Sequence, residues 1–260
     1  MQRITLTPSQ IDNSNIKLTT EQHHYLTRVI RLQNGAQFQV IDGTGKLYLA
    51  EIGDDTAQII QLITTDNLEL PQPVTLICAI PKGNSFDDIV RACTELGVTE
   101  IIPALSDRTL LQPSPQKLQR WRKIAQEAAE QSERMFIPTI AEPQVVRVIL
   151  DQFPDSSHKY ICEARGEHPH LLTCLQSTPL TQRIILAIGP EGGWTDGELD
   201  RSIKSGFQPV SLGRRILRTI TAPIVALSIV SAVAEQIPVP KSWYNVKLQT
   251  VKLPLDCLSS

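Results

Sequence analysis

The most constraining feature of the sequence is a pair of short apolar runs separated by an amphipathic segment. The runs are VTLICAI (74–80) and VTEIIPAL (98–105), each with the length of a buried strand. The segment between them has apolar residues at helical spacing, and Ser85 with Asp88 matches a capping box at its start. A strand, a helix and a second strand predict a βαβ unit, and therefore a parallel sheet with a right-handed crossover.

Three further apolar runs and two helices continue this alternation. KYICEA (159–164), RIILAI (183–188) and PVSLG (209–213) have the composition of buried strands. A long amphipathic helix is predicted from Ser114-Pro115, because serine is a good N-cap and proline fits the first helical position. The helix predicted over about 221–236 is apolar nearly all round, which is typical of a helix buried in a core or a subunit interface.

The first 70 residues have a different pattern, which predicts a small β-barrel. The runs FQVID (38–42), LYLAEI (47–52) and AQIIQLI (57–63) are β-like, and Asp42-Gly43 marks a turn between the first two. EQHHYLTRVIRL (21–32) is predicted to be helical. The residues expected on its apolar face are Tyr25, Leu26, Val29 and Ile30.

The expected domain boundary lies at Pro71-Gln72-Pro73, because extended segments flanked by proline often join domains. We therefore predict a barrel over residues 1–70, an α/β domain over 74–240 and a C-terminal tail over 241–260. The predicted fold class is α/β, with a small β-barrel ahead of the parallel sheet.

The composition narrows the class of protein. Of the 260 residues, 41% are hydrophobic and 20% are charged, and no apolar run approaches the roughly 18 residues of a membrane span. The first residues lack the apolar core of a signal peptide, and the five cysteines are scattered without a CxxC pair. These features predict a cytoplasmic protein with reduced thiols and no membrane association. No metal is expected, since neither His23-His24 nor His168-Pro169-His170 has further ligands at suitable spacing.

Basic residues are concentrated in one stretch of a chain whose net charge is only −2. Residues 201–220 contain five Lys/Arg and no Asp/Glu, whereas residues 1–70 contain five Lys/Arg and eight Asp/Glu. A local basic stretch on a near-neutral protein indicates a focused anionic partner such as phosphate or RNA. The alternative is a solvated face without a partner.

A glycine-rich loop, IGPEGGWTDGE (188–198), follows one of the predicted strands. Thr195 and Glu198 match a capping box, so a helix is expected to begin there. Ligands of open α/β sheets bind at the carboxyl ends of strands, where glycines let the backbone approach closely. The loop lacks the Lys-Ser/Thr of a P-loop and does not match GxGxxG, which disfavours a generic nucleotide-binding protein. A structural strand-to-helix turn is the alternative.

A second loop, LGRRILRT (212–219), also follows a predicted strand and leads into a helix. Its arginines are suited to phosphate contacts, which give affinity rather than sequence choice. Two such loops on neighbouring strands would frame one ligand. Surface solvation is again the alternative.

These two loops, in this order and at this distance, resemble the RsmE family, the bacterial small-subunit rRNA uridine-N3 methyltransferases of the knotted SPOUT superfamily. HHYLTRVIRL and VIDGTG resemble the family's PUA-like N-terminal barrel, and AIPKG, ACTELGVTEIIP and KIAQEAAEQSER match its central segments in order. The resemblance covers most of the chain up to about residue 240. It implies a PUA-like β-barrel, then a SPOUT α/β domain with a C-terminal trefoil knot, assembled as a homodimer.

The resemblance also implies a reaction, the methylation of uridine N3 in 16S rRNA (the uracil-1498 type) with S-adenosylmethionine as the donor. No metal is required, because the sulfonium is already a good electrophile. The donor is expected to contact the backbone and apolar walls of the two loops, namely Ile188, Gly189, Pro190, Glu191, Gly192, Gly193, Ser211, Leu212, Gly213, Ile216 and Leu217. The candidate RNA-binding residues are Arg28, Arg31, Lys82, Arg91, Arg214 and Arg215.

Two arginines are candidates for a catalytic role. Uridine N3 becomes nucleophilic only when its proton leaves, so a base, or a cation that stabilises the charge on the ring, would help. Arg218 is the first candidate for that cation, since it lies in the loop expected to face the donor. Arg134, in the family-like QSER, is the second and would reach across the dimer. An ordinary helix-surface arginine is the alternative for Arg134.

The sequence departs from the family pattern at Ile220, where the family usually has Glu after LRT. If that carboxylate serves as a base, activity would fall about 10²–10⁴-fold. If it only caps the next helix, Thr221 would substitute at a cost of about 1 kcal/mol or less. Three interpretations stay open: an active rRNA methyltransferase, a catalytically silenced RNA-binding relative, and a SPOUT methyltransferase that acts on tRNA.

Overall fold

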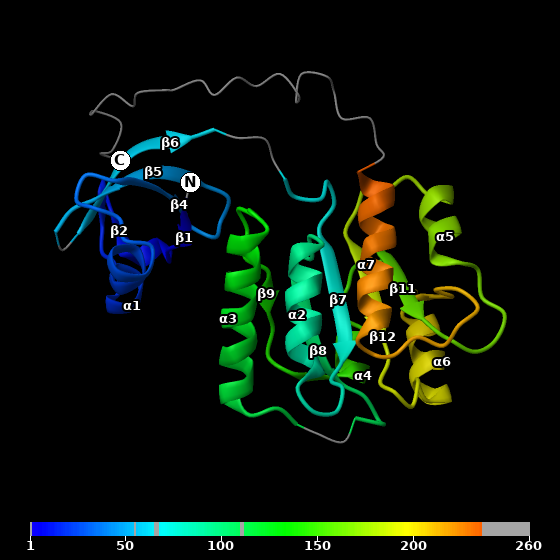
Figure 1. The fold of residues 1–260 in the computed structure, drawn as a ribbon. Helices are drawn as coiled ribbons and strands as arrows, with labels where there is room; N and C mark the ends of the chain where they lie inside the picture. The colour runs from blue at the N-terminus through cyan, green and yellow to red at the C-terminus, as the bar shows by residue number, and fades with distance from the viewer. Residues whose placement is uncertain (1, 55, 65–67, 110–111, 236–260) are drawn as a thin grey trace. The chain divides into compact units, whose positions relative to one another are not determined.

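The computed structural model describes residues 2–54, 56–64, 68–109 and 112–235, so the predicted tail lies outside the described residues. The described chain forms two compact units (Figure 1). The first unit extends to Leu68 and also includes Glu133–Phe136, and the second contains Glu69–Ser132 and the chain from Ile137 onward. The sequence did not reveal that the chain returns briefly to the first unit at Glu133–Phe136.

The first unit is built on a six-stranded sheet in the order β1-β4-β5-β6-β3-β2. Every pair is antiparallel except β1 with β4. The turn predicted at Asp42 is confirmed, because its carboxylate accepts from the amides of Thr44 and Lys46 at 2.8 and 3.1 Å. The strands are β1 (Arg3–Thr5), β2 (Ile11–Asp12), β3 (Asn15–Ile16), β4 (Gln37–Ile41), β5 (Leu47–Ile52) and β6 (Ala57–Ile63).

The helix predicted over residues 21–32 is only partly correct. A short helix, α1 (Thr20–His24), begins with a capping box, and a π-helical turn, η2 (Tyr25–Val29), continues it. The predicted apolar face is wrong, since Leu26 is buried while Tyr25 and Val29 are exposed. A π turn has wider spacing than an α-helix, so residues three and four apart no longer share a face.

The second unit contains a seven-stranded sheet whose pairs are all parallel, as the βαβ pattern predicts. The strand order is β10-β8-β7-β12-β11-β13, with β9 paired to β8. The strands are β7 (Val74–Ala79), β8 (Glu100–Leu105), β9 (Thr139–Ile140), β10 (Gln144–Val145), β11 (His158–Cys162), β12 (Ile184–Ile188) and β13 (Gln208–Val210).

Helices cover both faces of this sheet, so the unit has three layers. Alternate residues of each strand point to opposite faces and enter two separate cores. The larger core includes α2 (Ser85–Glu95), α3 (Pro115–Gln131), α5 (Leu171–Ser177) and α7 (Thr221–Ala234). The smaller core, on the other face, includes α4 (Val146–Ile149) and Leu199 of α6 (Asp196–Lys204).

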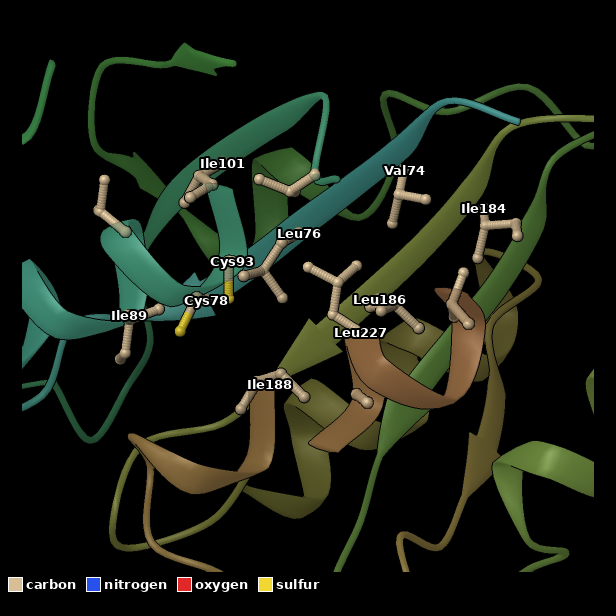
Figure 2. Packing of buried hydrophobic residues seen from close by; sticks show 14 of the residues in the cluster. Val74, Leu76, Cys78, Ile89, Cys93, Ile101, Ile184, Leu186, Ile188 and Leu227 are labelled. Atoms are coloured by element: carbon tan, nitrogen blue, oxygen red, sulfur yellow. The ribbon is translucent and has the colours of Figure 1, made fainter. Parts of the chain in front are cut away.

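Figure 2 shows the centre of the larger core, where Leu76 of β7 and Leu186 of β12 face Leu227 of α7. Cys78 and Cys93 lie together in this core, on β7 and α2. Burial raises the pKa of the Cys93 thiol to about 12 and the pKa of the Cys78 thiol well above its usual value. Both side chains therefore act as small apolar groups in this core.

Two helix starts were predicted from serine caps, and one is correct. Ser114 caps α3 by accepting from the Lys117 amide, with Pro115 in the first helical position. At α2 the cap is Asn84 and it makes no side-chain cap bond, so the capping box predicted from Ser85 is wrong. Because the chain enters α2 one residue early, Ser85 is already helical.

Helix α7 is less buried than its sequence predicts. Its residues on one side are buried against the larger core, but Ser228 is exposed, and Ile224, Val225 and Ile229 are only partly buried. The helix therefore has an apolar side that the described residues cover incompletely. None of the helices in the described ranges has both the length and the hydrophobicity of a membrane span.

Candidate active site

Four parallel strands of the second unit end at one level of the sheet. Ile188 of β12 is in register with Cys78 of β7 and with Cys162 of β11, and Cys162 is in register with Val210 of β13. The loops that leave these strands therefore begin side by side at the carboxyl edge. In open α/β sheets this edge is where ligands bind.

A cavity of about 540 Å³ lies at this edge, within the second unit. The two loops singled out in the sequence both line this cavity. Its walls include, from the predicted cofactor-binding set, Ile188, Gly189, Pro190, Glu191, Gly192, Gly193, Leu212, Gly213, Ile216 and Leu217. The volume suits a ligand of nucleoside size.

The glycine-rich loop is fixed by backbone geometry and by Trp194. Gly193 has φ +73°, a left-handed conformation suited to glycine, and its amide donates to the Pro190 carbonyl at 2.9 Å. Trp194 is buried, and its indole Nε1 donates to the Cys162 carbonyl at 3.1 Å. A Cβ added at Gly189 would lie 3.1 Å from the Trp194 ring, so this glycine allows the indole to pack beneath the loop.

The predicted capping box at the end of this loop is confirmed. The Thr195 side chain accepts from the Glu198 amide at 3.2 Å, and Glu198 accepts from the Thr195 amide at 2.9 Å. The Glu198 carboxylate is buried and accepts a further bond from the Asp107 amide at 2.9 Å. The start of α6 is thereby tied to the loop after β8.

A further bond joins the glycine-rich loop to the loop after β7. The Glu191 carboxylate accepts from the backbone amide of Lys82 at 3.2 Å. Lys82 itself has an exposed side chain and is not among the cavity-lining residues. Its proposed contact with RNA phosphate therefore lies outside the cavity.

The arginine-rich loop is organised differently. Ser211 accepts from the Gly213 amide at 3.0 Å and donates to the Gly213 carbonyl at 3.1 Å, so it supports the loop and is not among the cavity-lining residues. Gly213 has φ +120°. Arg215 and Arg218 line the cavity with exposed side chains, and Ile216 is 76% exposed. This loop therefore offers two guanidinium groups and one apolar side chain to a ligand of the cavity.

Ile220 lines the cavity at the start of α7 and packs against the larger core. It occupies the N-cap position without a side-chain cap bond. The amides of Thr221 and Ala222 instead donate to the Arg218 carbonyl at 2.8 and 2.9 Å. The helix start is therefore closed by the backbone of Arg218, and Thr221 lies inside the helix rather than at its cap.

Cys162 and Glu163 bring a thiol and a carboxylate to the cavity wall. Burial, with a smaller contribution from the Glu163 charge, raises the pKa of the Cys162 thiol to about 12. A thiol with this pKa stays protonated near neutral pH and is a poor nucleophile. Glu163 accepts from the Arg165 amide at 2.8 Å. The cavity is therefore built for binding rather than for covalent catalysis through sulfur.

Several predicted site residues lie elsewhere. Arg134 is buried in the first unit, beyond the end of α3, so its interpretation as a helix-surface residue is wrong. The reason is local, because Glu133 adopts φ +61° and turns the chain away from the helix direction. Arg28 and Arg31 are exposed in the first unit, and Arg31 has φ +57°. The other two are exposed in the second unit outside the cavity lining, namely Arg91 and Arg214.

Sequence reasoning missed Arg108, which lines the cavity from the loop after β8. Its Nη1 donates to the carbonyls of Gly192 and Trp194. The only signal was a polar run directly after an apolar strand, at residues 106–108. The described residues contain no group of His, Cys, Asp and Glu side chains that could hold a metal ion.

Comparison with known proteins supplies the family. Residues 68–231 match the model of an RNA methyltransferase domain, and residues 18–63 match that of an RNA methyltransferase PUA domain. The ribosomal RNA small subunit methyltransferase E of Synechocystis is 47% identical over 237 residues, covering 90% of this chain and 78% of the relative. The protein of the same name from Bacillus subtilis is 32% identical, covering 89% of this chain and 96% of the relative.

Solved structures agree with these matches. The crystal structure of a ribosomal RNA small subunit methyltransferase E from Neisseria gonorrhoeae, bound to S-adenosylmethionine, has a TM-score of 0.77 and 31% identity. It covers 90% of this chain and 98% of that chain. A methyltransferase from Legionella pneumophila, also in complex with S-adenosylmethionine, has a TM-score of 0.78 and 28% identity, covering 88% and 96% of the two chains.

Proposed function

The chain belongs to the ribosomal RNA small subunit methyltransferase E family, and from that premise we propose that it methylates N3 of a uridine in 16S rRNA with S-adenosylmethionine as donor. One observation of the structure carries the proposal: both predicted loops line a single cavity at the carboxyl edge of the sheet. The cavity offers backbone polar groups and apolar side chains, which suit an adenosine.

The residues of the two loops have different roles in this proposal. When bound, the donor supplies a methyl group on a positively charged sulfur. The glycine-rich loop and Leu212 hold its nucleoside, while Arg218 lines the cavity from the second loop. As the N3–carbon bond forms and the carbon–sulfur bond breaks, the N3 proton passes to solvent. The Arg218 guanidinium stabilises the negative charge that develops on the uracil ring.

The RNA is bound mainly through phosphates in this proposal. Arg215 of the second loop lines the cavity, and its neighbour Arg214 is exposed outside the lining. Lys82 and Arg91 are exposed on the same unit. Arg28 and Arg31 contribute from the PUA-like first unit. Contacts of this kind make binding strongly dependent on salt. Arg134 is kept as a second catalytic candidate, acting from a partner subunit.

A homodimer is part of the proposal. The incompletely covered apolar side of α7 gives it support, since Ile224, Val225 and Ile229 are only partly buried in the single chain. The trefoil knot follows from the family resemblance. The division into 1–70 and 74–240 rests on the change of sequence pattern at Pro71-Gln72-Pro73, and action in the cytoplasm rests on the scattered cysteines.

A catalytically silenced RNA-binding relative is the second candidate, and Ile220 is the observation that favours it. Ile220 packs with the larger core, so a carboxylate here would be placed beside apolar groups. We expect Ile220→Glu to leave the rate within a few-fold of the natural protein. A large rise from a negligible starting rate would instead support the silenced relative.

The proposal is tested by methylation of unmodified small ribosomal subunits, read by reverse transcription. An N3-methyl group blocks base pairing, so the expected result is a new stop at one uridine that depends on S-adenosylmethionine. Purified tRNA serves as the parallel substrate, and transfer to tRNA alone would favour a tRNA enzyme. Donor binding without any transfer would support the silenced relative.

A further inference from the structure

Arg108 connects two loops that are far apart in sequence. It follows β8, and its Nη1 donates to two carbonyls of the glycine-rich loop, those of Gly192 and of Trp194, the latter at 3.2 Å. Its aliphatic chain also packs on this loop, since a Cβ at Gly192 would lie 3.1 Å from the Arg108 Cδ. One side chain therefore fixes the loop by hydrogen bonds and by close packing.

These bonds complete the pairing of two peptide units. In the unit between Gly192 and Gly193, the carbonyl accepts from Arg108 and the amide donates to Pro190. In the unit between Trp194 and Thr195, the carbonyl accepts from Arg108 and the amide donates to Glu198. A peptide unit bonded at both ends cannot rotate without losing a bond, so the loop is held in one shape.

The backbone that leads into Arg108 is also held in place. The preceding residue, Asp107, donates its amide to the buried Glu198, and its carboxylate accepts from Thr195 at 3.2 Å. The same carboxylate accepts from Arg147 at 3.0 and 3.1 Å. The side chain of Arg108 therefore starts from an ordered position beside the loop that it contacts.

We infer that Arg108 is a positioning residue of the donor site, which holds residues 192–195 in the shape that binds S-adenosylmethionine. The inference rests on the proposed function, because it assigns this wall of the cavity to the donor. Losing Arg108 frees two carbonyls and lets the loop sample other shapes, so only a fraction of molecules is ready to bind. Donor affinity then falls in proportion to that fraction.

The test compares Arg108→Ala and Arg108→Lys with Arg122→Ala. Arg122 makes the same type of contact outside the cavity, since its guanidinium donates two bonds of 3.3 Å to the Ile140 carbonyl. We expect Arg108→Ala to raise the KM and Kd for S-adenosylmethionine about tenfold or more and to change kcat at saturating donor less than about threefold. Arg108→Lys keeps a positively charged hydrogen-bond donor, so this variant retains most of the affinity for S-adenosylmethionine. Arg122→Ala leaves donor binding unchanged.

The readouts are calorimetric titration with S-adenosylmethionine and steady-state methylation of small subunits at varied donor. Unchanged donor affinity in Arg108→Ala would overturn the inference. So would a loss of kcat at unchanged donor affinity, which would assign Arg108 to RNA or to the reacting atoms. If the natural protein itself does not bind S-adenosylmethionine, the proposed function fails and not merely the role of Arg108.

Discussion

The two loops that line the cavity differ in how firmly the protein holds them. The glycine-rich loop is bonded to the loop after β7 through Glu191, to the loop after β8 through Arg108 and to the end of β11 through Trp194. In the arginine-rich loop, the backbone of Ser211 is bonded to Pro169 and Leu171, and its side chain is bonded to Gly213. From Gly213 to the start of α7, the bonds seen are those of the α7 amides to the Arg218 carbonyl. One loop is preorganised before any ligand arrives, whereas the other presents exposed side chains.

The difference suggests a division between affinity and chemistry. A cavity wall that is already rigid binds a small methyl donor more tightly, because no conformational entropy is lost in ordering the wall when the donor binds. A loop that must meet a large RNA benefits from exposed charge and freedom to adjust. We therefore expect changes in the first loop to act on the KM for the donor and changes at the arginines of the second loop to act on kcat and RNA binding.

The largest effect is expected from Arg218→Ala in the arginine-rich loop. Removing a cation that stabilises developing charge should lower kcat about 10²–10³-fold. The KM for S-adenosylmethionine should change little, and Arg218→Lys should recover part of the rate because it keeps the charge. Single-turnover methylation of small subunits at saturating donor measures the effect. Full recovery of the rate at high donor concentration would show instead that Arg218 binds the donor rather than stabilising the reacting ring.

The next largest effect is expected from Gly189→Ala in the glycine-rich loop. The added methyl group would lie 3.1 to 3.3 Å from the Trp194 ring, and the indole is held by its bond to the Cys162 carbonyl. Overpacking of this kind costs about 1–3 kcal/mol, which should appear as weaker donor binding and a lower free energy of unfolding.

Gly197→Ala is the matched control for this change. Gly197 lies in α6, where an added Cβ meets nothing within 4 Å, so alanine should stabilise the helix by up to about 1 kcal/mol. Donor titration and urea unfolding separate the two variants. Equal donor affinity for both would show that the tight packing beneath the loop has no role in binding.

The sequence predicted those parts of the site that depend on neighbouring residues. The capping box of Thr195 and Glu198 spans four residues, so its pattern is visible in the chain. The bond from Arg108 to Gly192 spans 84 residues and depends on the strand order β8-β7-β12, which periodicity does not give. Arg134 was misplaced because one left-handed residue, Glu133, ends the helical direction. The local motifs of the site could therefore be predicted from the sequence, whereas the long-range contacts that support them could not.

Alkaline pH tests the buried core of the second unit, which supports the glycine-rich loop. Burial raises the pKa of the Cys93 and Cys162 thiols to about 12, and also raises that of Cys78. In the unfolded chain these thiols ionise near 9.0, so stability is complete below that pH and is lost as pH rises toward the folded values. Each thiol should lower the free energy of unfolding by about 1.4 kcal/mol per pH unit in this window.

Urea unfolding at a series of pH values above 9 measures this slope. Cys93→Ala removes one thiol from the core, so the slope should fall by the contribution of a single thiol. The variant should also have a lower free energy of unfolding near neutral pH than the natural protein. A slope identical to that of the natural protein would mean that Cys93 ionises as readily in the folded state as in the unfolded chain.

The smallest effect is expected from Thr195→Ala at the end of the glycine-rich loop. The change removes a helix cap, a loss of about 1 kcal/mol in the free energy of unfolding, and it also removes the Thr195 bond to Asp107. Ser114→Ala removes an equivalent cap from α3, away from the cavity, and so serves as the control. If the glycine-rich loop is held as a unit, Thr195→Ala should weaken donor binding a few-fold while Ser114→Ala leaves it unchanged. Equal donor affinity in both variants, with equal losses of stability, would show that Arg108 and Trp194 hold the loop without help from the helix cap.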